Sequence, residues 1–207
     1  MISIGDKKNI PVFPLSGAIL LPNANLPLNI FEERYIEMID YALSKEKVIG
    51  MIQPLENSNE LYKVGCLGKI TSYNETEDGR YIINLLGKMR FKTIEEIDTP
   101  SKFRIFKVEH NQESEKYFDI NTENFDKKIV IEKLKLFFKN TKNKMNLNSV
   151  EDIDPGDLVK MIAMACPFKI NEKQMLLESK NVNDLAKNLL DLFDSYASNN
   201  NLSNTIN

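Results

Sequence analysis

The sequence is poor in the side chains that most often bind metal ions. It has two cysteines, Cys66 and Cys166, which are far apart and outside any CxxC motif, and a single histidine, His110. These are too few ligands for a zinc site of recognisable spacing. The cysteines fit reduced core thiols better than a disulfide, although a disulfide stays open. We therefore predict no metal site and no cofactor.

The chain also lacks an excess of positive charge and a long apolar run. Its 27 lysines and arginines are outnumbered by 30 aspartates and glutamates, which gives a formal net charge of −3. Such a chain has no overall positive field to attract nucleic acid or anionic lipid, but local basic patches remain open. The run AILL before Pro22 is too short to cross a bilayer. We therefore expect a cytoplasmic protein that contacts no membrane.

Patterns for nucleotide binding and nucleophilic catalysis are absent or incomplete. Gly65, Gly68 and Lys69 lack the GxxxxGK[ST] spacing of a phosphate loop, and Lys69 leads into an expected strand. A Ser-His-Asp triad would need His110, which stands at an expected strand end beside Glu109. Counting residues leaves a Ser-Lys dyad open, but no serine lies in a glycine-rich sharp turn. We therefore predict no catalytic residue and no enzymatic activity.

The stretch LPLNIFEERYIEMIDYAL, residues 26–43, begins with strand-like alternation and continues with apolar residues at helical spacing. Glu32 and Glu33 lie between the two patterns. They could divide acid and base roles if burial separated their pKa values, but acidic residues also favour the first turn of a helix. We favour the helix start. Phe31 and Tyr35 are then expected to be buried, so that Phe31→Ala costs about 3–5 kcal/mol of stability.

Short apolar runs separated by turn residues fill the first half of the chain, which is typical of β structure. Asp78 and Gly79 separate two of these runs and predict a hairpin. In the run that follows, apolar residues occupy both faces of the expected strand, and Gly87 is placed at a bulge or bend. A curved, partly closed barrel over about residues 9–112 fits this pattern better than a flat sheet.

Helical spacing dominates the second half, over about residues 122–197. We expect three or four helices. Asp154 is placed to cap one of them, Asn171 another, and Asn181 or Asn183 a third.

Two polar stretches accompany these helices. The lysine-rich stretch 126–144 predicts a basic helix face, which fits a solvated surface better than a nucleic-acid site. The tail, residues 198–207, has too little apolar content to order itself.

Several motifs, taken in order, resemble the N-terminal substrate-recognition domain of the ATP-dependent Lon protease. They are IPVFPLSGAILLPNANLPLNIFEERYIEMIDYAL, GMIQP, LYKVGCLGKI, DGRYIINLLGKMRF and EKQMLLES, within about residues 9–197. The resemblance is to short proteins made of this domain alone, since the chain has no room for the ATPase and Ser-Lys peptidase modules of Lon. It implies a PUA-like β pseudo-barrel followed by a helical bundle, and a role in recognising polypeptide segments.

The chain departs from the family pattern at two positions. Asn23 stands where the family usually has glycine, and Asn29 stands where it usually has histidine. Asparagine tolerates the left-handed backbone conformation that glycine often supplies, so we expect the turn at Asn23 to survive.

We therefore predict an α+β protein with a PUA-like β pseudo-barrel at residues 9–112 and a helical subdomain at 122–197. Its expected function is non-catalytic binding of exposed or unfolded polypeptide segments, with a separate protease or a chaperone as a further partner. The alternative is RNA binding, because PUA-like barrels of other families hold RNA. The acidic balance of the chain argues against that alternative.

The predicted binding surface is the first loop and the helix after it. A loop this apolar either folds into the core or stays partly exposed, and the sequence leaves both outcomes open. If exposed, it would border a shallow groove for an extended peptide. The predicted binding residues are Ile19, Leu20, Leu21, Pro22, Tyr35, Met38, Gln53 and Pro54.

Overall fold

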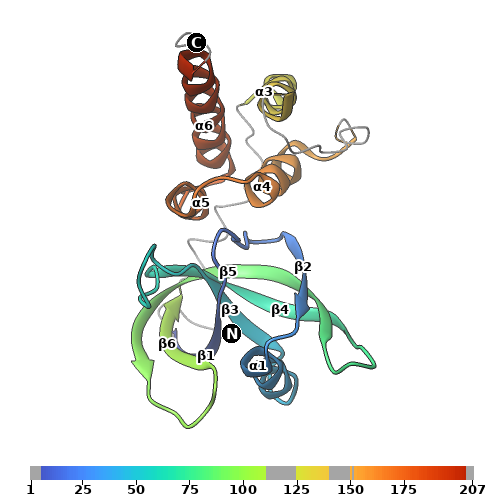
Figure 1. Ribbon diagram of the computed structural model, residues 1–207, viewed down its shortest axis with the longest axis vertical. Coiled ribbons are helices and arrows are strands. Elements are labelled where there is room, and N and C mark those ends of the chain that lie inside the picture. Colours follow the sequence, from blue (N-terminus) through green and yellow to red (C-terminus); the bar gives the residue numbers. More distant parts are fainter. Residues whose placement is uncertain (1–5, 111–124, 140–149, 151, 204–207) are drawn as a thin grey trace.

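The computed structural model describes residues 6–110, 125–139, 150 and 152–203, which form a β barrel and a helical half (Figure 1). The described elements of the barrel are β1 (Asp6–Pro14), β2 (Asn25–Ile30), α1 (Glu33–Leu43), β3 (Val48–Ile52), β4 (Val64–Glu75), β5 (Tyr81–Ile97) and β6 (Arg104–His110). Those of the helical half are α3 (Lys127–Lys139), α4 (Pro155–Ala165), α5 (Ile170–Leu177) and α6 (Val182–Ser203). The expected boundaries at 112 and 122 lie outside the described residues.

Five strands close into a ring in the order β5-β4-β3-β1-β6 and back to β5. β1 and β3 pair in parallel, and the other neighbours are antiparallel. β2 lies outside this ring and pairs with β5 alone, so it is the edge strand of the described sheet. A closed sheet followed by helices confirms the α+β prediction.

The long strand β5 pairs with both β2 and β6 because it bends near Gly87. Gly68 of β4 pairs with Gly87, but the residue before Gly68 pairs with Met89, so Lys88 is the extra residue of a bulge. Residues before this bulge pair with β2, and residues after it pair with β6. The predicted bend is therefore confirmed. The predicted hairpin between β4 and β5 is confirmed as well, with Gly79 at a φ of 79°.

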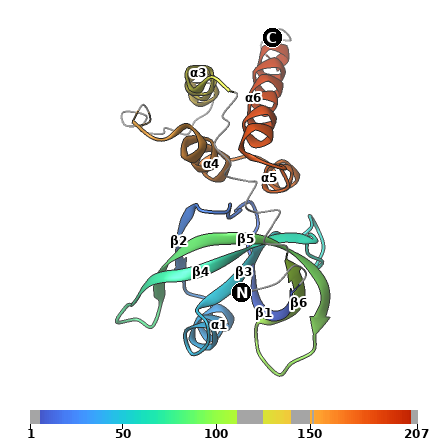
Figure 2. The same cartoon turned by 180° about the vertical axis from the view of Figure 1, so that it is seen from behind.

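In the helical half, α4 and α5 lie nearer the barrel, while α3 and α6 lie farther from it (Figures 1 and 2). Asp154 caps α4 by accepting hydrogen bonds from the backbone N–H groups of Gly156 (3.0 Å) and Asp157 (3.3 Å). Asn181 caps α6 by accepting from the N–H of Asp184 (2.9 Å). These caps satisfy backbone donors that a helix start leaves free, as the sequence predicts.

One hydrophobic cluster runs from the barrel into the helical half. It includes Leu20 and Leu21 of the first loop together with Leu158 and Ile162 of α4. A smaller cluster containing Phe91 fills the rest of the barrel. Both cysteines are buried free thiols, so the alternative of a disulfide is wrong.

Two local predictions are wrong. Phe31 is 65% exposed, because α1 begins at Glu33 and its helical spacing does not extend back to Phe31. Asn171 lies inside α5, and the cap position of that helix is taken by Lys169. In addition, α6 continues to Ser203, beyond the expected end at residue 197.

Candidate functional site

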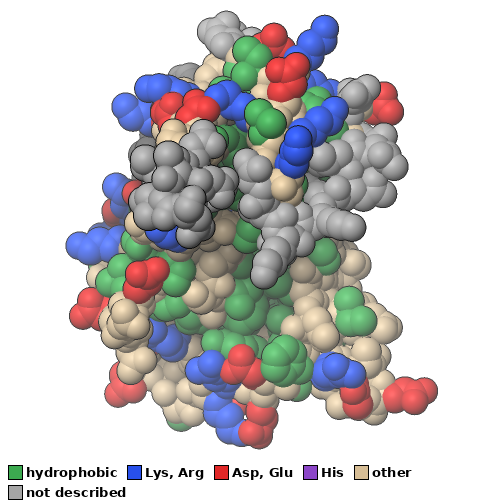
Figure 3. Space-filling model, turned by 45° about the horizontal axis from the view of Figure 1, so that its top comes forward, with side chains coloured by type: hydrophobic (Ala, Val, Ile, Leu, Met, Phe, Trp, Pro, Cys, Tyr) green, Lys and Arg blue, Asp and Glu red, His purple; other side chains and the backbone are tan. Residues whose placement is uncertain are grey.

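A groove of about 410 Å³ lies at the junction of the two halves. One wall is the loop that leads into β2, and the other is the side of α4 that faces this loop. Figures 1 and 2 show the start of β2 next to α4. In the space-filling view, hydrophobic side chains also gather along the junction (Figure 3). The residues that line the groove are Asn23, Ala24, Asn25, Leu26, Ile153, Asp157, Lys160, Met161, Met164 and Ala165.

The loop wall is held against β5 by close backbone contact at Gly87. The N–H of Asn23 donates to the carbonyl of Gly87, and the N–H of Gly87 donates to the carbonyl of Ala24, each at 2.9 Å. A Cβ atom at residue 87 would lie 2.0 Å from the carbonyl oxygen of Leu21, so glycine is required. Asn23 has a left-handed φ of 61°, which confirms that the turn survives the replacement of glycine by asparagine.

The α4 wall is a second apolar face of that helix. Leu158 and Ile162 pack in the main hydrophobic cluster, whereas Met161 and Met164 are half-buried and line the groove. The three-residue spacing of the two methionines places them one above the other on the same side of the helix. Methionine is unbranched and polarizable, so this wall can adapt to apolar side chains of different shapes.

The charged groups of the groove are paired with each other. Lys160 Nζ lies 3.4 Å from Asp157 Oδ1; the lysine side chain is 6% exposed and the aspartate side chain 64%. Opposite charges at this separation leave little positive field to attract a phosphate. The remaining surface is mainly aliphatic or thioether, from Ala24, Leu26, Ile153, Met161, Met164 and Ala165.

The edge strand β2 begins in this groove. Its first five residues alternate between exposed and half-buried, and Leu26 and Leu28 belong to the half-buried set. Pro27 removes one backbone donor from the strand, a feature that limits uncontrolled pairing at sheet edges. A ligand would therefore be held here mainly by side-chain contact.

The structure places the predicted binding residues outside this groove. Apart from the half-buried Pro54, these residues are buried, and none of the eight lines the groove. The first half of the loop is drawn into the core by the contact at Gly87, and the wall of the groove is formed by the next residues, 23–26. The buried members are Ile19, Leu20, Leu21, Pro22, Tyr35, Met38 and Gln53.

Gln53 ties the barrel to the helical half. Its Nε2 donates to the carbonyl of Ile170 and to Oε1 of Gln174, both at 3.1 Å. The Nε2 of Gln174 donates in turn to the carbonyl of Val64 at 3.0 Å. These contacts join the residue after β3 and the start of β4 to α5, so they stabilise the relative position of the barrel and the helical half.

The other side chains considered from sequence do not form a reactive site. Glu32 pairs with Arg34, while the hydrogen bond and charge of Lys102 lower the pKa of Glu33, which is the opposite of what a general acid needs. His110 is buried at the end of β6. Among the described residues, no three metal-binding side chains gather, and no described helix is long and apolar enough to cross a membrane.

Leu26, Ile153, Met161 and Met164 are among the groove residues that the sequence did not single out. The three-residue spacing of the methionines was the available signal. The spacing of the methionines indicates a groove wall only once the structure shows that the loop before β2 faces α4.

Comparison with known proteins places this chain in a family. Residues 9–195 match the family model for the ATP-dependent protease La (LON) substrate-binding domain. The chain is 28% identical over 181 residues to the Lon protease of Dictyoglomus thermophilum, covering 84% of this chain and 23% of that protein. It is 29% identical over 206 residues to Lon protease 1 of Bdellovibrio bacteriovorus, covering 88% and 24%. The chain thus spans about a quarter of the length of these relatives.

Two solved structures share the fold. A Lon N-terminal domain protein from Xanthomonas campestris matches with a TM-score of 0.62 at 18% identity, covering 89% of this chain and 98% of that chain. The N-terminal domain of the Mycobacterium avium complex Lon protease matches with a TM-score of 0.61 at 19% identity, covering 90% and 98%.

Proposed function

Since the chain belongs to the LON substrate-binding domain family, we propose that it binds exposed or unfolded polypeptide segments at the groove between the β2 loop and α4. The ligand is a short stretch of aliphatic or aromatic residues in an extended conformation. Its side chains enter between Leu26 on one wall and the two methionines on the other. A separate protease or a chaperone would act on the bound segment.

The observation that carries this proposal is the apolar character of a groove that is already open. Its volume of about 410 Å³ lies within the range of about 300–1,000 Å³ that is typical of ligand sites. A segment with several apolar side chains fits that space. We expect weak binding, with a Kd on the order of 10 μM to 1 mM, because the ordering of a flexible peptide opposes the contact.

RNA binding is not favoured at this groove. Single-stranded RNA is usually held by aromatic side chains that stack on bases and by cations that face phosphates. Among the described residues that line the groove none is aromatic, and the lysine is paired with Asp157.

Methionine methyl groups give a direct test. The protein would be labelled with ¹³C at its methionine methyls and titrated with short apolar peptides from β-casein, an unfolded protein. We expect concentration-dependent shifts at Met161 and Met164. Met175, which is 41% exposed on α5 and outside the groove, serves as the matched control and should not shift.

Matched substitutions separate specific binding from general stickiness. Met164→Asp should lower the affinity for the peptide by about tenfold or more, since it places a charged group in an apolar contact. Met175→Asp should leave the affinity unchanged. Equal shifts at all three methionines, or shifts at Met161 and Met164 with polyuridine but not with peptide, would refute the groove as a peptide site.

We further propose that the chain is cytoplasmic and that binding involves no chemical step. The described lining residues include no serine, threonine, cysteine or histidine, and the one carboxylate among them is paired with Lys160. Purified protein should therefore leave β-casein intact. Cleavage that a point substitution within this chain abolishes would contradict the non-catalytic assignment, because a contaminating protease would not respond to that substitution.

A further inference from the structure

α3 is a strongly basic helix in an acidic chain. Its 13 residues include five lysines and one glutamate, a net charge of +4, whereas the whole chain carries −3. Lys127 donates to the carbonyl of Ile153, and Lys133 pairs with Asp194 of α6. The other three lysines are exposed and form no ion pair with any residue that the structure describes; they are Lys128, Lys135 and Lys139.

Two large aliphatic side chains remain exposed on the same helix. Ile129 is 45% exposed and Leu136 is 56% exposed. Seven residues make almost two helical turns, so these side chains lie nearly in line, about 10.5 Å apart along the helix axis. The three exposed lysines flank this line on one side, and Glu132 lies between them and the line.

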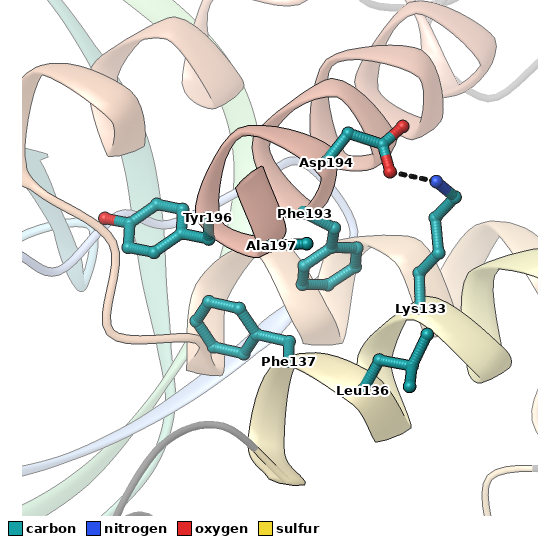
Figure 4. Close-up of a pocket in the computed structure, with 7 residues that line it drawn as sticks. All are labelled: Lys133, Leu136, Phe137, Phe193, Asp194, Tyr196 and Ala197. Atoms are coloured by element: carbon teal, nitrogen blue, oxygen red, sulfur yellow. Dashed lines mark hydrogen bonds and ion pairs between the residues drawn. The ribbon is translucent and has the colours of Figure 1, made fainter. Parts of the chain in front are cut away.

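A notch of about 60 Å³ opens beside Leu136, between α3 and α6 (Figure 4). The rings of Phe137 and Phe193 line it, with centroids 5.3 Å apart. The ion pair between Lys133 and Asp194 bridges the two helices at its side (Figure 4). Since the other lining groups are mainly apolar, the notch is suited to one aliphatic side chain of a ligand.

We propose that this surface binds an acidic amphipathic helix of a partner protein. Two packed helices present a groove in which a third helix can lie, with apolar residues at i, i+3 or i+4, and i+7 against Ile129, the notch and Leu136. Glutamates or aspartates beside that apolar stripe would face Lys128, Lys135 and Lys139. Such charge pairs fix the orientation of the partner and speed its association.

The same features argue against three other occupants. A second copy meeting α3 against α3 would place two sets of lysines face to face. The large apolar side chains that α3 exposes are both aliphatic, so this helix offers a nucleic acid no exposed aromatic ring to stack on. A membrane needs a broader apolar face than the one line formed by Ile129 and Leu136.

This surface is separate from the peptide groove. α3 and the neighbouring part of α6 lie on the side of the helical half away from the barrel, whereas the groove lies at the junction with it (Figures 1 and 2). The partner helix and an unfolded segment could therefore be bound at the same time. Failure of either proposal would leave the other intact.

Tryptophan fluorescence provides the test, since the chain contains no tryptophan. The probe is a synthetic amphipathic helix with leucines at i, i+3 and i+7, flanking glutamates and one tryptophan. Its counterpart carries lysines in place of the glutamates. We expect the acidic peptide to bind at least about tenfold more tightly than the basic one. Its affinity should fall as the salt concentration is raised, because salt screens the charge pairs.

Substitutions at exposed positions of α3 test the site without disturbing the core. Leu136→Ser should lower the affinity for the acidic peptide about tenfold. The double variant Lys135→Glu, Lys139→Glu should bind the basic peptide more tightly than the acidic one. Lys187→Glu, at an exposed position of α6 that does not line the notch, is the matched control and should change neither.

Several results would overturn the inference. These are equal binding of both peptides, an acidic peptide unaffected by Leu136→Ser, or tighter binding of polyuridine or phosphatidylserine vesicles that is lost in the double lysine variant. Sedimentation showing a dimer that Leu136→Ser dissociates would assign the surface to a second copy instead.

Discussion

Residues 19–22 lie in the first loop and residues 23–26 lead from it into β2, yet the environments of these two adjacent segments are opposite. The first four are buried, whereas the next four are exposed or half-buried and line the groove. The change occurs where the loop backbone touches Gly87 of β5. The apolar content of a loop therefore indicates that it is anchored, but the path of its backbone decides which residues a ligand can reach.

The largest expected contrast is between Leu20 of the first loop and Leu26 near the start of β2. Leu20 is fully buried in the main cluster, so Leu20→Ala should lower the free energy of unfolding by about 2–5 kcal/mol. Leu26→Ala should cost only about 1 kcal/mol, because Leu26 is half-buried, but it should weaken peptide binding. Urea denaturation and the methionine titration measure the two effects. Equal losses of stability in the two variants would show that Leu26 is packed as firmly as Leu20.

A methyl group at position 87 should disturb both the buried residues 19–22 and the groove-lining residues 23–26. Gly87→Ala should cost about 2–3 kcal/mol, because the new Cβ would clash with the carbonyl of Leu21 and displace the loop. The displaced loop should also shift the methyl signals of Met161 and Met164. Gly79→Ala is the control, since its hairpin has open space around residue 79 and is not part of the groove. It should lower stability without moving those signals.

The sequence predicted much of this architecture because local patterns determine it. The hairpin at Gly79, the bend at Gly87, and the caps Asp154 and Asn181 each follow from a backbone requirement that few residue types meet. The groove did not follow, because it forms where residues 23–26 meet a helix far away in the chain. Helical spacing also could not tell that Phe31 precedes the helix, since spacing gives the period of a helix but not its first residue.

Two buried lysines lie near the groove, and their partners differ. Lys160 pairs with Asp157, while Lys173 is 1% exposed and donates to the carbonyls of Ala163 (2.9 Å) and Met164 (2.6 Å) at the end of α4. Burial lowers the pKa of Lys173 from 10.5 to about 8, and it outweighs the opposing effect of Cys166.

This shift predicts a stability that rises with pH. Between about 8 and 10.5 the unfolded chain binds more protons at Lys173 than the folded chain does, so the free energy of unfolding increases through that window. From pH 8 to 9 the gain should be about 1 kcal/mol. Cys166 opposes this gain at higher pH. Burial raises the pKa of its thiol from 9.0 to about 12, so above about pH 9 the folded chain binds more protons there than the unfolded chain, and stability falls.

A variant isolates the contribution of Lys173. Lys173→Met removes the titrating group, so the stability difference between parent and variant should change by about 1 kcal/mol between pH 8 and 9. Urea denaturation at the two pH values measures this change. A difference that stays constant with pH would mean that Lys173 titrates near its ordinary value in the folded protein.

The smallest expected effect concerns Phe31, which a reading of helical spacing alone assigns to the core. Phe31 is 65% exposed, so Phe31→Ala should change the free energy of unfolding by no more than about 0.5 kcal/mol. Tyr35 is the matched comparison on the same segment: it is 7% exposed and its ring lies 4.4 Å from that of Phe13. Tyr35→Ala should therefore cost about 3–5 kcal/mol. A loss of several kcal/mol in both variants would show that Phe31 packs against the protein in solution. Its aromatic ring would then belong with the anchored residues of the first loop rather than with the accessible ones.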